Sequence, residues 1–275
     1  MVKIHPTAIL EGNIELGQNV EIGAFTVLKG NIKIGDNTKI GSRVSIYHNV
    51  EIGSNCQIYD GCVIGEAPQH LRDKGLEGKV LIGNNTILRE YVTVNRGTDF
   101  DRKLTKIGSN AFLMAYCHVA HDCEVGDYVI MANAATLGGH VVIEHHAVLG
   151  GLAAVQQKCR VGAYSMVGGL SGVNKDVPPF TRAVGHHVEL KGLNIVALKR
   201  AGFSKEDIKL LDKVYRKIFT SSKRLKEAVE EVLKEYVNNK YVAYFCRFIL
   251  ESLNQGKGIA VDKTLKRLVA KVSET

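Results

Sequence analysis

Residues 16–40 read LGQNVE IGAFTV LKGNIK IGDNTK I, and an aliphatic residue opens every group of six. The same spacing runs from Ile4 to Ile64, returns from Ile82 to Val94, and continues from Ile107 to Val173, where only Met131 is not Ile, Leu or Val. A period of six fits no helix. The fifth residue of a hexad is usually small or β-branched, and on a strand it faces the same side as the next aliphatic residue.

Each hexad therefore predicts a very short strand followed by a corner. Gly, Asn and Asp gather at the corner positions, which suits turns in left-handed or bridge conformations. One hexad cannot bury its apolar pair alone, but stacked coils can. If three hexads of six make a triangular coil of about 18 residues, successive coils lie about 4.8 Å apart. The predicted fold class is mainly β, a parallel solenoid of hexapeptide repeats followed by an α-helical C-terminal part.

Two stretches interrupt the repeat, near residues 66–80 and near residues 95–106. The first is charged and rich in Pro and Gly, and the second breaks the spacing by one residue. Both are expected to leave the wall as projecting loops. Loops on a rigid scaffold are where binding and catalytic residues usually lie.

The chain leaves the repeat after Val173, and we divide it into a β-helix domain, 1–187, and a helical domain, 188–275. Ser204 is a good N-cap for one of the helices. We expect helices over about 189–200, 204–219, 222–237, 240–254 and 262–273.

The basic charge of the protein lies in its C-terminal part. The formal net charge is +8, and from Lys191 onward 19 Lys and Arg stand against 10 Asp and Glu. This composition fits a solvated helical surface or a docking face for an acidic partner. No basic groove interleaved with aromatic residues accompanies it, so nucleic acid is not an expected partner.

The cysteines are expected to be core residues. No Cys-x-x-Cys is present, Cys246 falls on an apolar helix face, and the other five take the small inward hexad position. A reducing compartment fits this use of cysteine. The sequence has no apolar run of 18 residues and no signal-like start. We therefore expect a cytoplasmic protein without a membrane span. The five hexad cysteines are Cys56, Cys62, Cys117, Cys123 and Cys159.

A column of polar residues is predicted along one face of the solenoid. With coils of 18 residues and the second loop accounted for, successive coils of this face carry Asn95, then His118 and His121, then His140, then Gln156 and Gln157. A single histidine on a solenoid wall is usually only solvated. A column of them beside two projecting loops favours a functional site.

Two chemistries remain open from these residues alone. Three neutral imidazoles, from His118, His140 and His145, could hold zinc with hydroxide as the nucleophile. Alternatively, one histidine is a general base that takes a proton from a hydroxyl as it attacks an acyl carbon. In the second case Asp122 would orient His121, and the bare backbone before His140 would offer an N–H to the oxyanion.

Several motifs resemble one family over essentially the whole chain. The family is that of the bacterial acyl-carrier-protein:UDP-N-acetylglucosamine O-acyltransferases, which open lipid A synthesis. The motifs that carry the resemblance are IHPTA (4–8), GEAPQHLR (65–72), RGT (96–98), HVAHDC (118–123), ANAATLGGHV (132–141), VGGLSGV (167–173) and NIVALKRAGF (194–203).

The resemblance implies a left-handed β-helix and a cytoplasmic homotrimer with active sites between neighbouring subunits. It implies transfer of a 3-hydroxyacyl chain from acyl carrier protein to the sugar 3-hydroxyl of the UDP-sugar, without metal or other cofactor. His121 would be the general base, Asp122 its helper and the Gly139 N–H the oxyanion donor. The basic helices would dock the acidic carrier protein. The implied substrate-binding residues are Gln69, His70, Arg72, Asn95, His118, His140, Gln157, Gly169, His187, Asn194 and Arg200.

Departures from the family pattern leave alternatives. Asn95 stands where familiar members carry His, and His70 where Asp is common, so the same reaction on a 3-amino sugar, giving an amide, is one alternative. A zinc-dependent γ-type carbonic anhydrase shares the coil and is a second. A related N-acyltransferase carries an extra N-terminal domain, whereas here the repeat begins at Ile4. A protein that serves only as a non-catalytic scaffold is the last alternative.

Overall fold

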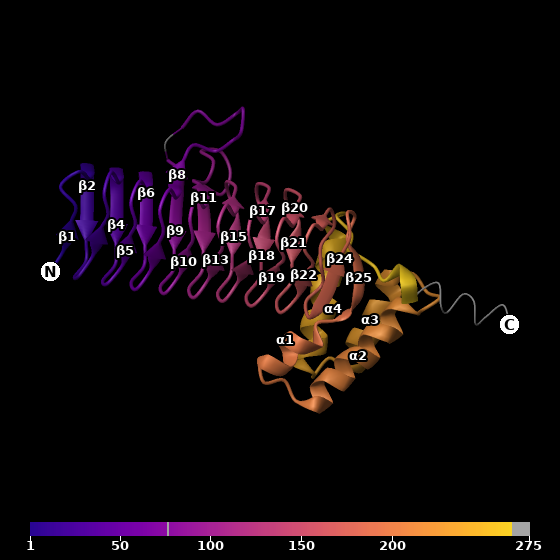
Figure 1. The fold of residues 1–275 in the computed structure, drawn as a ribbon. Helices are drawn as coiled ribbons and strands as arrows, with labels where there is room; N and C mark the ends of the chain where they lie inside the picture. Colours follow the sequence, from indigo (N-terminus) through magenta and orange to yellow (C-terminus); the bar gives the residue numbers. More distant parts are fainter. Residues whose placement is uncertain (76, 266–275) are drawn as a thin grey trace.

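Residues in neighbouring coils pair 18 positions apart, as Lys3 does with Glu21. A computed structural model of the chain describes residues 1–75 and 77–265. The coils stack one on the next from the N-terminus toward a helical cluster at the other end (Figure 1). The predicted coil of three hexads is confirmed, and each coil contributes strands to three faces.

The first face is an 11-stranded sheet that is parallel except for its last pair. Each early strand is only two residues long, as a hexad predicts. The strands of the first face are β1 (Lys3–Ile4), β3 (Glu21–Ile22), β5 (Lys39–Ile40), β7 (Gln57–Ile58), β10 (Ile87–Leu88), β13 (Phe112–Leu113), β16 (Ile130–Met131), β19 (Val148–Leu149), β22 (Met166–Val167), β24 (Thr181–Val184) and β25 (Glu189–Leu193).

The second and third faces form one 14-stranded sheet, because long strands join them in the first coils. These strands are β2 (Ile9–Leu16), β4 (Val27–Ile34) and β6 (Ser45–Ile52). They bend at Gly12 and Gly30, where φ is +99° and +129°. An added Cβ on Gly12 would lie 2.5 Å from the Gly30 carbonyl oxygen, so this corner requires glycine.

The remaining strands divide between the two faces. The second face continues with β8 (Val63–Glu66), β11 (Thr93–Asn95), β14 (His118–Val119), β17 (Thr136–Leu137), β20 (Ala154–Val155) and β23 (Gly172–Val173). The third face continues with β9 (Lys79–Ile82), β12 (Leu104–Ile107), β15 (Glu124–Val125), β18 (Val142–Ile143) and β21 (Arg160–Val161).

The core lies inside the coils and consists of the first and fifth hexad residues. Leu28, Ile46 and Leu88 are fully buried first residues. All six cysteines are buried and free, as expected. Burial raises the pKa of the Cys62 thiol to about 12, so this group stays protonated and acts as a small apolar side chain.

Corners place the fourth hexad residue in the left-handed region. Asn37, Asp122 and His140 have φ values of 57°, 59° and 62°. Asn and Asp accept this conformation better than other residues that carry a side chain. The repeat therefore fixes the backbone of Asp122 and His140 before any tertiary contact acts on their side chains.

Two insertions leave the wall as predicted. Ser54 and Asn84 are hydrogen-bonded in neighbouring coils and are 30 positions apart. Thr93 and His118 are likewise bonded and are 25 apart. The first loop, between β8 and β9, projects well beyond the coils in Figure 1.

The C-terminal part contains α1 (Ile195–Arg200), α2 (Lys205–Phe219), α3 (Leu225–Glu235) and α4 (Lys240–Asn254). The helices expected near 204–219, 222–237 and 240–254 are confirmed. Most of the helix expected over 262–273 lies outside the described residues. None of the helices described is long and apolar enough to cross a membrane.

The helix expected over 189–200 is wrong for its first half. Glu189–Leu193 is strand β25, which pairs antiparallel with β24. Gly185, with φ +111°, turns the chain back, and Gly192, with φ +77°, does not fit a helix. The helix starts only after Asn194, whose side chain accepts a hydrogen bond from the Ala197 N–H.

Candidate active site

His121 and Asp122 form a buried pair at the corner that follows β14. The His121 Nδ1 atom lies 2.9 Å from Asp122 Oδ2, and the exposed fractions of the two residues are 6% and 0%. A carboxylate only accepts hydrogen bonds, so Nδ1 carries the proton. The lone pair of the neutral ring is then on Nε2, which is the arrangement of a general base.

Asp122 is held ionised by the second loop. Its carboxylate accepts hydrogen bonds from the Thr98 N–H at 3.1 Å and from the Thr98 hydroxyl at 2.9 Å. Burial by itself would raise the pKa of this carboxyl, but the hydrogen bonds from His121 and Thr98 together outweigh burial and lower it. Asp122 is therefore a carboxylate at neutral pH.

Gly139 lies against the His121 ring, one coil further along. An added Cβ on Gly139 would be 2.5 Å from His121 Cε1 and 2.6 Å from Nε2. Only glycine allows this approach. Within the described part of the chain, the Gly139 N–H donates no hydrogen bond. His121 Nε2 thus lies against Gly139, a residue with an unpaired backbone N–H, and acyl transfer uses such donors to bind an oxyanion.

Two more imidazoles flank His121. The rings of His70 and His140 lie 5.3 and 5.2 Å from it, both nearly perpendicular to it. His140 Nε2 is 2.8 Å from Asp101 Oδ2, and Phe100 packs on His70 at 5.1 Å between ring centroids. Residues of the second loop therefore hold both neighbours of His121.

The zinc arrangement considered above is not assembled. Among the described residues, the group with ligand atoms close enough for a metal is His121, Asp122 and His140. His145 lies at a different corner, where it contacts His146. The set of His118, His140 and His145 is therefore not brought together in one chain.

His118 and Asn95 lie at the second face near this pair. His118 Nδ1 is 2.7 Å from the Thr93 hydroxyl, and burial together with nearby His121 lowers the pKa of His118. Asn95 is buried, and its amide donates to the Ala67 carbonyl at 2.7 Å. Asn95 thus fixes the start of the first loop and does not lie on the open wall as expected.

The two loops are joined by an ion pair that the sequence did not reveal. Arg96 is 2% exposed, donates to the Gly75 carbonyl at 2.6 Å, and has Asp73 Oδ2 at 3.4 Å. Gln69 and Arg72, expected to bind substrate, are exposed on the loop so held. Only the RGT motif signalled this segment, and nothing in the repeat assigned a role to Arg96, Thr98 or Asp101.

The other predicted residues lie elsewhere on the same chain. Gln157 is exposed in the coil after that of Gly139, at the same corner of the solenoid. Gly169 is exposed at a different corner, after β22. His187 contacts Asn174 in the turn before β25. Asn194 caps α1 and donates to the Tyr164 carbonyl at 2.9 Å, and Arg200 is exposed at the end of α1. One chain therefore does not unite the predicted site.

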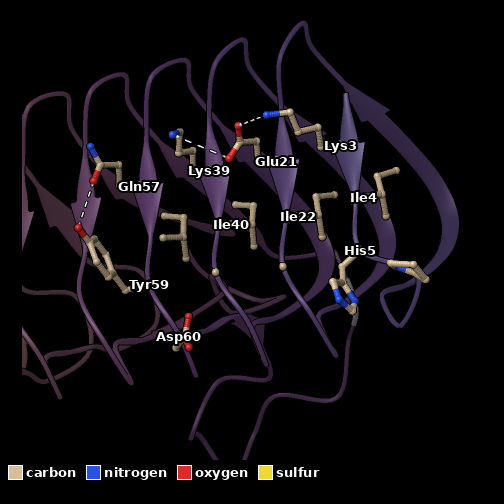
Figure 2. Close-up of a pocket in the computed structure, with 14 residues that line it drawn as sticks. Lys3, Ile4, His5, Glu21, Ile22, Lys39, Ile40, Gln57, Tyr59 and Asp60 are labelled. Carbon is tan, nitrogen blue, oxygen red and sulfur yellow. Dashed lines mark hydrogen bonds and ion pairs between the residues drawn. The ribbon is translucent and has the colours of Figure 1, made fainter. Parts of the chain in front are cut away.

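A groove on the first face lies apart from all of these residues (Figure 2). It has a volume of about 640 Å³ and is bordered by Lys3, Glu21 and Lys39, which form a ladder of ion pairs across neighbouring coils. Ile4, Ile22 and Ile40 follow one another in the same coils in Figure 2. The groove contains none of the predicted site residues.

Comparisons with known proteins agree with this geometry. The bacterial transferase hexapeptide family matches residues 31–66 and 104–139, and the second domain of UDP-N-acetylglucosamine O-acyltransferase matches residues 176–260. A Sulfurihydrogenibium protein named acyl-(acyl-carrier-protein)–UDP-N-acetylglucosamine O-acyltransferase is 54% identical over 269 residues, 98% of each chain. The Aquifex aeolicus protein of the same name is 54% identical over 91% of this chain and 96% of its own.

Solved structures extend the likeness to the fold. The Francisella novicida UDP-N-acetylglucosamine acyltransferase superposes with a TM-score of 0.92 at 33% identity, covering 97% of this chain and 98% of that one. The Campylobacter jejuni UDP-N-acetylglucosamine acyltransferase superposes with a TM-score of 0.89 at 36% identity, covering 95% of this chain and 100% of that one. The predicted left-handed parallel β-helix with a helical C-terminal part is confirmed. The chain belongs to the family of acyl-(acyl-carrier-protein)–UDP-N-acetylglucosamine O-acyltransferases.

Proposed function

We propose that this protein transfers a 3-hydroxyacyl chain from acyl carrier protein to the 3-hydroxyl of UDP-N-acetylglucosamine, the first step of lipid A synthesis. The observation that carries the proposal is the arrangement of His121, whose Nδ1 is bonded to buried Asp122 and whose Nε2 lies beside Gly139. A base and an oxyanion donor meet there, and burial raises the pKa of the adjacent Cys123 thiol, so it is no nucleophile. Such a site suits direct attack by a substrate hydroxyl.

The reaction follows from these contacts. His121 Nε2 takes the proton of the sugar hydroxyl while its oxygen attacks the thioester carbonyl carbon. The Gly139 N–H donates to the oxygen that becomes negative, and Asp122 stabilises the imidazolium that forms. The tetrahedral adduct then breaks its C–S bond, and the imidazolium returns the proton to the carrier's thiolate. No metal or cofactor takes part in this proposal.

The assembly we propose is a homotrimer with sites between neighbouring subunits. Outward residues of the first face are charged or polar in early coils but apolar later, and the next corner also exposes large apolar side chains. Apolar patches of this kind mark protein interfaces, and a head-to-tail contact between two different patches that rotates each subunit by a third of a turn gives a closed ring of three. A neighbour could then supply what one chain holds apart. The apolar residues are Ile87, Phe112, Ile130, Val148 and Met166 on the face, and Tyr91, Tyr116, Leu152 and Leu170 at the corner.

The proposed donor docks on α2. Lys205, Lys209 and Lys213 are exposed and spaced by four, so they share one side of the helix. A basic stripe suits an acidic carrier protein and speeds its encounter. The proposal includes a cytoplasmic location, which the six free and buried cysteines support.

The test offers the purified protein UDP-N-acetylglucosamine and its 3-amino analogue, each with carrier protein that bears 3-hydroxyacyl chains of several lengths. We expect mass spectrometry to find one acyl chain added to the hydroxyl sugar. Acylation of only the amino sugar, or turnover that needs added zinc, contradicts the proposal. Sedimentation should give three times the mass of the chain, and a monomer would overturn the proposed assembly.

Docking is tested with variants matched in charge. Lys209→Gln with Lys213→Gln should raise the KM for the acyl carrier roughly 3- to 10-fold at low salt and less at high salt, because salt screens the attraction. Lys29→Gln with Lys33→Gln removes the same charge from β4 and should leave this KM unchanged. Equal effects of the two pairs would exclude a specific docking stripe.

A further inference from the structure

Thr98 contacts the proposed catalytic pair through the Asp122 carboxylate. It is fully buried, and both its N–H and its hydroxyl donate to the Asp122 carboxylate. The hydroxyl shares Oδ2 with His121 Nδ1, each at 2.9 Å. Thr98 and His121 therefore hold the same carboxylate oxygen from two directions.

The second loop is built to deliver Thr98 to this place. Gly97 approaches the chain so closely that an added Cβ would lie 2.0 Å from the Leu104 nitrogen. Arg96, directly before Gly97, is fixed by Asp73 and the Gly75 carbonyl of the first loop. The residue after Thr98 is fixed as well, because the Asp99 N–H donates to Asp73 Oδ1 at 3.0 Å. The loop position of Thr98 is thus set by the residues before and after it.

Other contacts place the backbone of Asp122 but not its carboxylate. The Asp122 N–H donates to the Thr105 hydroxyl at 2.9 Å, and Arg102 donates to the Asp122 carbonyl at 3.1 Å. Besides His121, Thr98 is the residue of the described chain that hydrogen-bonds the carboxylate, and His140 Nε2 lies 3.5 Å from Oδ2. Its loss leaves a fully buried carboxylate with fewer donors, which is costly.

We propose that Thr98 is a positioning residue of the acyl-transfer reaction, which keeps Asp122 ionised and aimed so that His121 presents Nε2 to the substrate. The inference rests on the proposed function. Without the Thr98 hydroxyl, Oδ2 turns away from the imidazole or takes up a proton. In either case Nδ1 loses its acceptor, and the ring no longer favours the tautomer with a free Nε2.

The test compares Thr98→Val, which removes the hydroxyl at nearly constant volume, with Thr98→Ser, which keeps it. Thr38→Val is the matched control, since Thr38 is also buried and its hydroxyl donates to the Gly53 carbonyl, with no hydrogen bond to either loop among the described residues. Thr98→Val should lower kcat roughly 10- to 100-fold, as expected for a hydrogen bond to a charged group, with KM changed less than about 2-fold. Thr98→Ser should keep kcat within about 3-fold, and Thr38→Val should leave it unchanged.

A spectroscopic readout separates positioning from folding. Nitrogen-15 NMR of the wild-type His121 ring should show the Nδ1–H tautomer, and Thr98→Val should shift the ring toward a mixture. Where Thr98→Val folds poorly, Thr98→Ala serves in its place. An unchanged kcat with an unchanged tautomer overturns the inference. If His121→Ala also stays active, the proposed function fails; if it is inactive, only the role of Thr98 fails.

Discussion

Two corners of this prism carry histidine at the same hexad position, and only at one of them, the proposed catalytic site, does the histidine bond to an acid. His121 with Asp122 and His145 with His146 are the third and fourth residues of their hexads, and φ is 59° at Asp122 and 60° at His146. In the first corner an acid takes the left-handed position; in the second another imidazole does. The backbone is nearly the same, so the difference lies in the partners.

Those partners give the two corners different chemistry. Asp122 is an acceptor for Nδ1, and the second loop covers the pair. At the second corner the two Nδ1 atoms lie 3.1 Å apart, and His146 stacks between Tyr128 and Tyr164. Burial, and then neighbouring His145, lowers the pKa of His146. The same repeat position thus gives the arrangement of a general base where an acid and a covering loop accompany the histidine, and a stack of rings where they do not.

The largest expected difference between the corners is catalytic. His121→Ala should lower kcat/KM roughly 10²- to 10⁴-fold, the usual contribution of a positioned base. His145→Ala, at the equivalent position, should stay within about 2-fold. The measurement is acyl transfer at fixed carrier concentration, with circular dichroism to check folding. Comparable losses in both variants would break the comparison.

A second test uses glycines that share one hexad position. Gly139→Ala would press a methyl group onto the His121 ring, and we expect a loss in kcat of about 10²-fold, because a displaced base and oxyanion donor act together. Gly151→Ala is the control, since its nearest contact would be an ordinary 3.5 Å to the Asn133 carbonyl. Full activity of Gly139→Ala would mean that the His121 ring and the Gly139 N–H do not act together in the reaction.

The sequence predicted the parts of the molecule that repeat. The short strands and the five buried hexad cysteines follow from a period of six, and the placement of His121 beside Gly139 follows once three hexads make a coil, because each hexad repeats the same backbone. The contacts of Thr98, Arg96 and Asp101 did not follow, because a loop outside the repeat has no register. The strand Glu189–Leu193 was missed because pairing with β24 depends on a turn at Gly185.

A smaller effect is expected where each corner holds a second histidine. Asp101→Asn removes the charged partner of His140 and should raise the KM for the sugar nucleotide several-fold, with little change in melting temperature. Tyr128→Leu removes the ring stacked on His146 and should lower the melting temperature by a few degrees while KM stays the same. If both variants changed KM, or both changed only the melting temperature, the two corners would not differ as a substrate site and a structural stack.

The smallest effect is on stability against pH, and both corners give it the same sign. The pKa values of Asp122 and His146 are lowered by folding, so the unfolded chain binds more protons and acid destabilises the protein. The windows differ: stability from His146 is lost as pH falls below about 6.5, and that from Asp122 below about 4. We expect His146→Gln to reduce the fall in melting temperature only as pH drops below about 6.5. Asp122→Asn should reduce it only below about pH 4. Each change should amount to about 1–3 °C. A reduced fall in the opposite windows would reverse the assignment.

Paired residues in neighbouring coils are 18 positions apart, so the solenoid can change length only by whole coils. One residue added inside the wall would reverse the inward and outward alternation of the strand beyond it, whereas a whole added turn would leave every later neighbour in place. Evolution can therefore lengthen or shorten the column in complete turns without disturbing the chemistry. Irregular insertions survive only where they bulge out, as the two loops do, and new specificity should collect at those points.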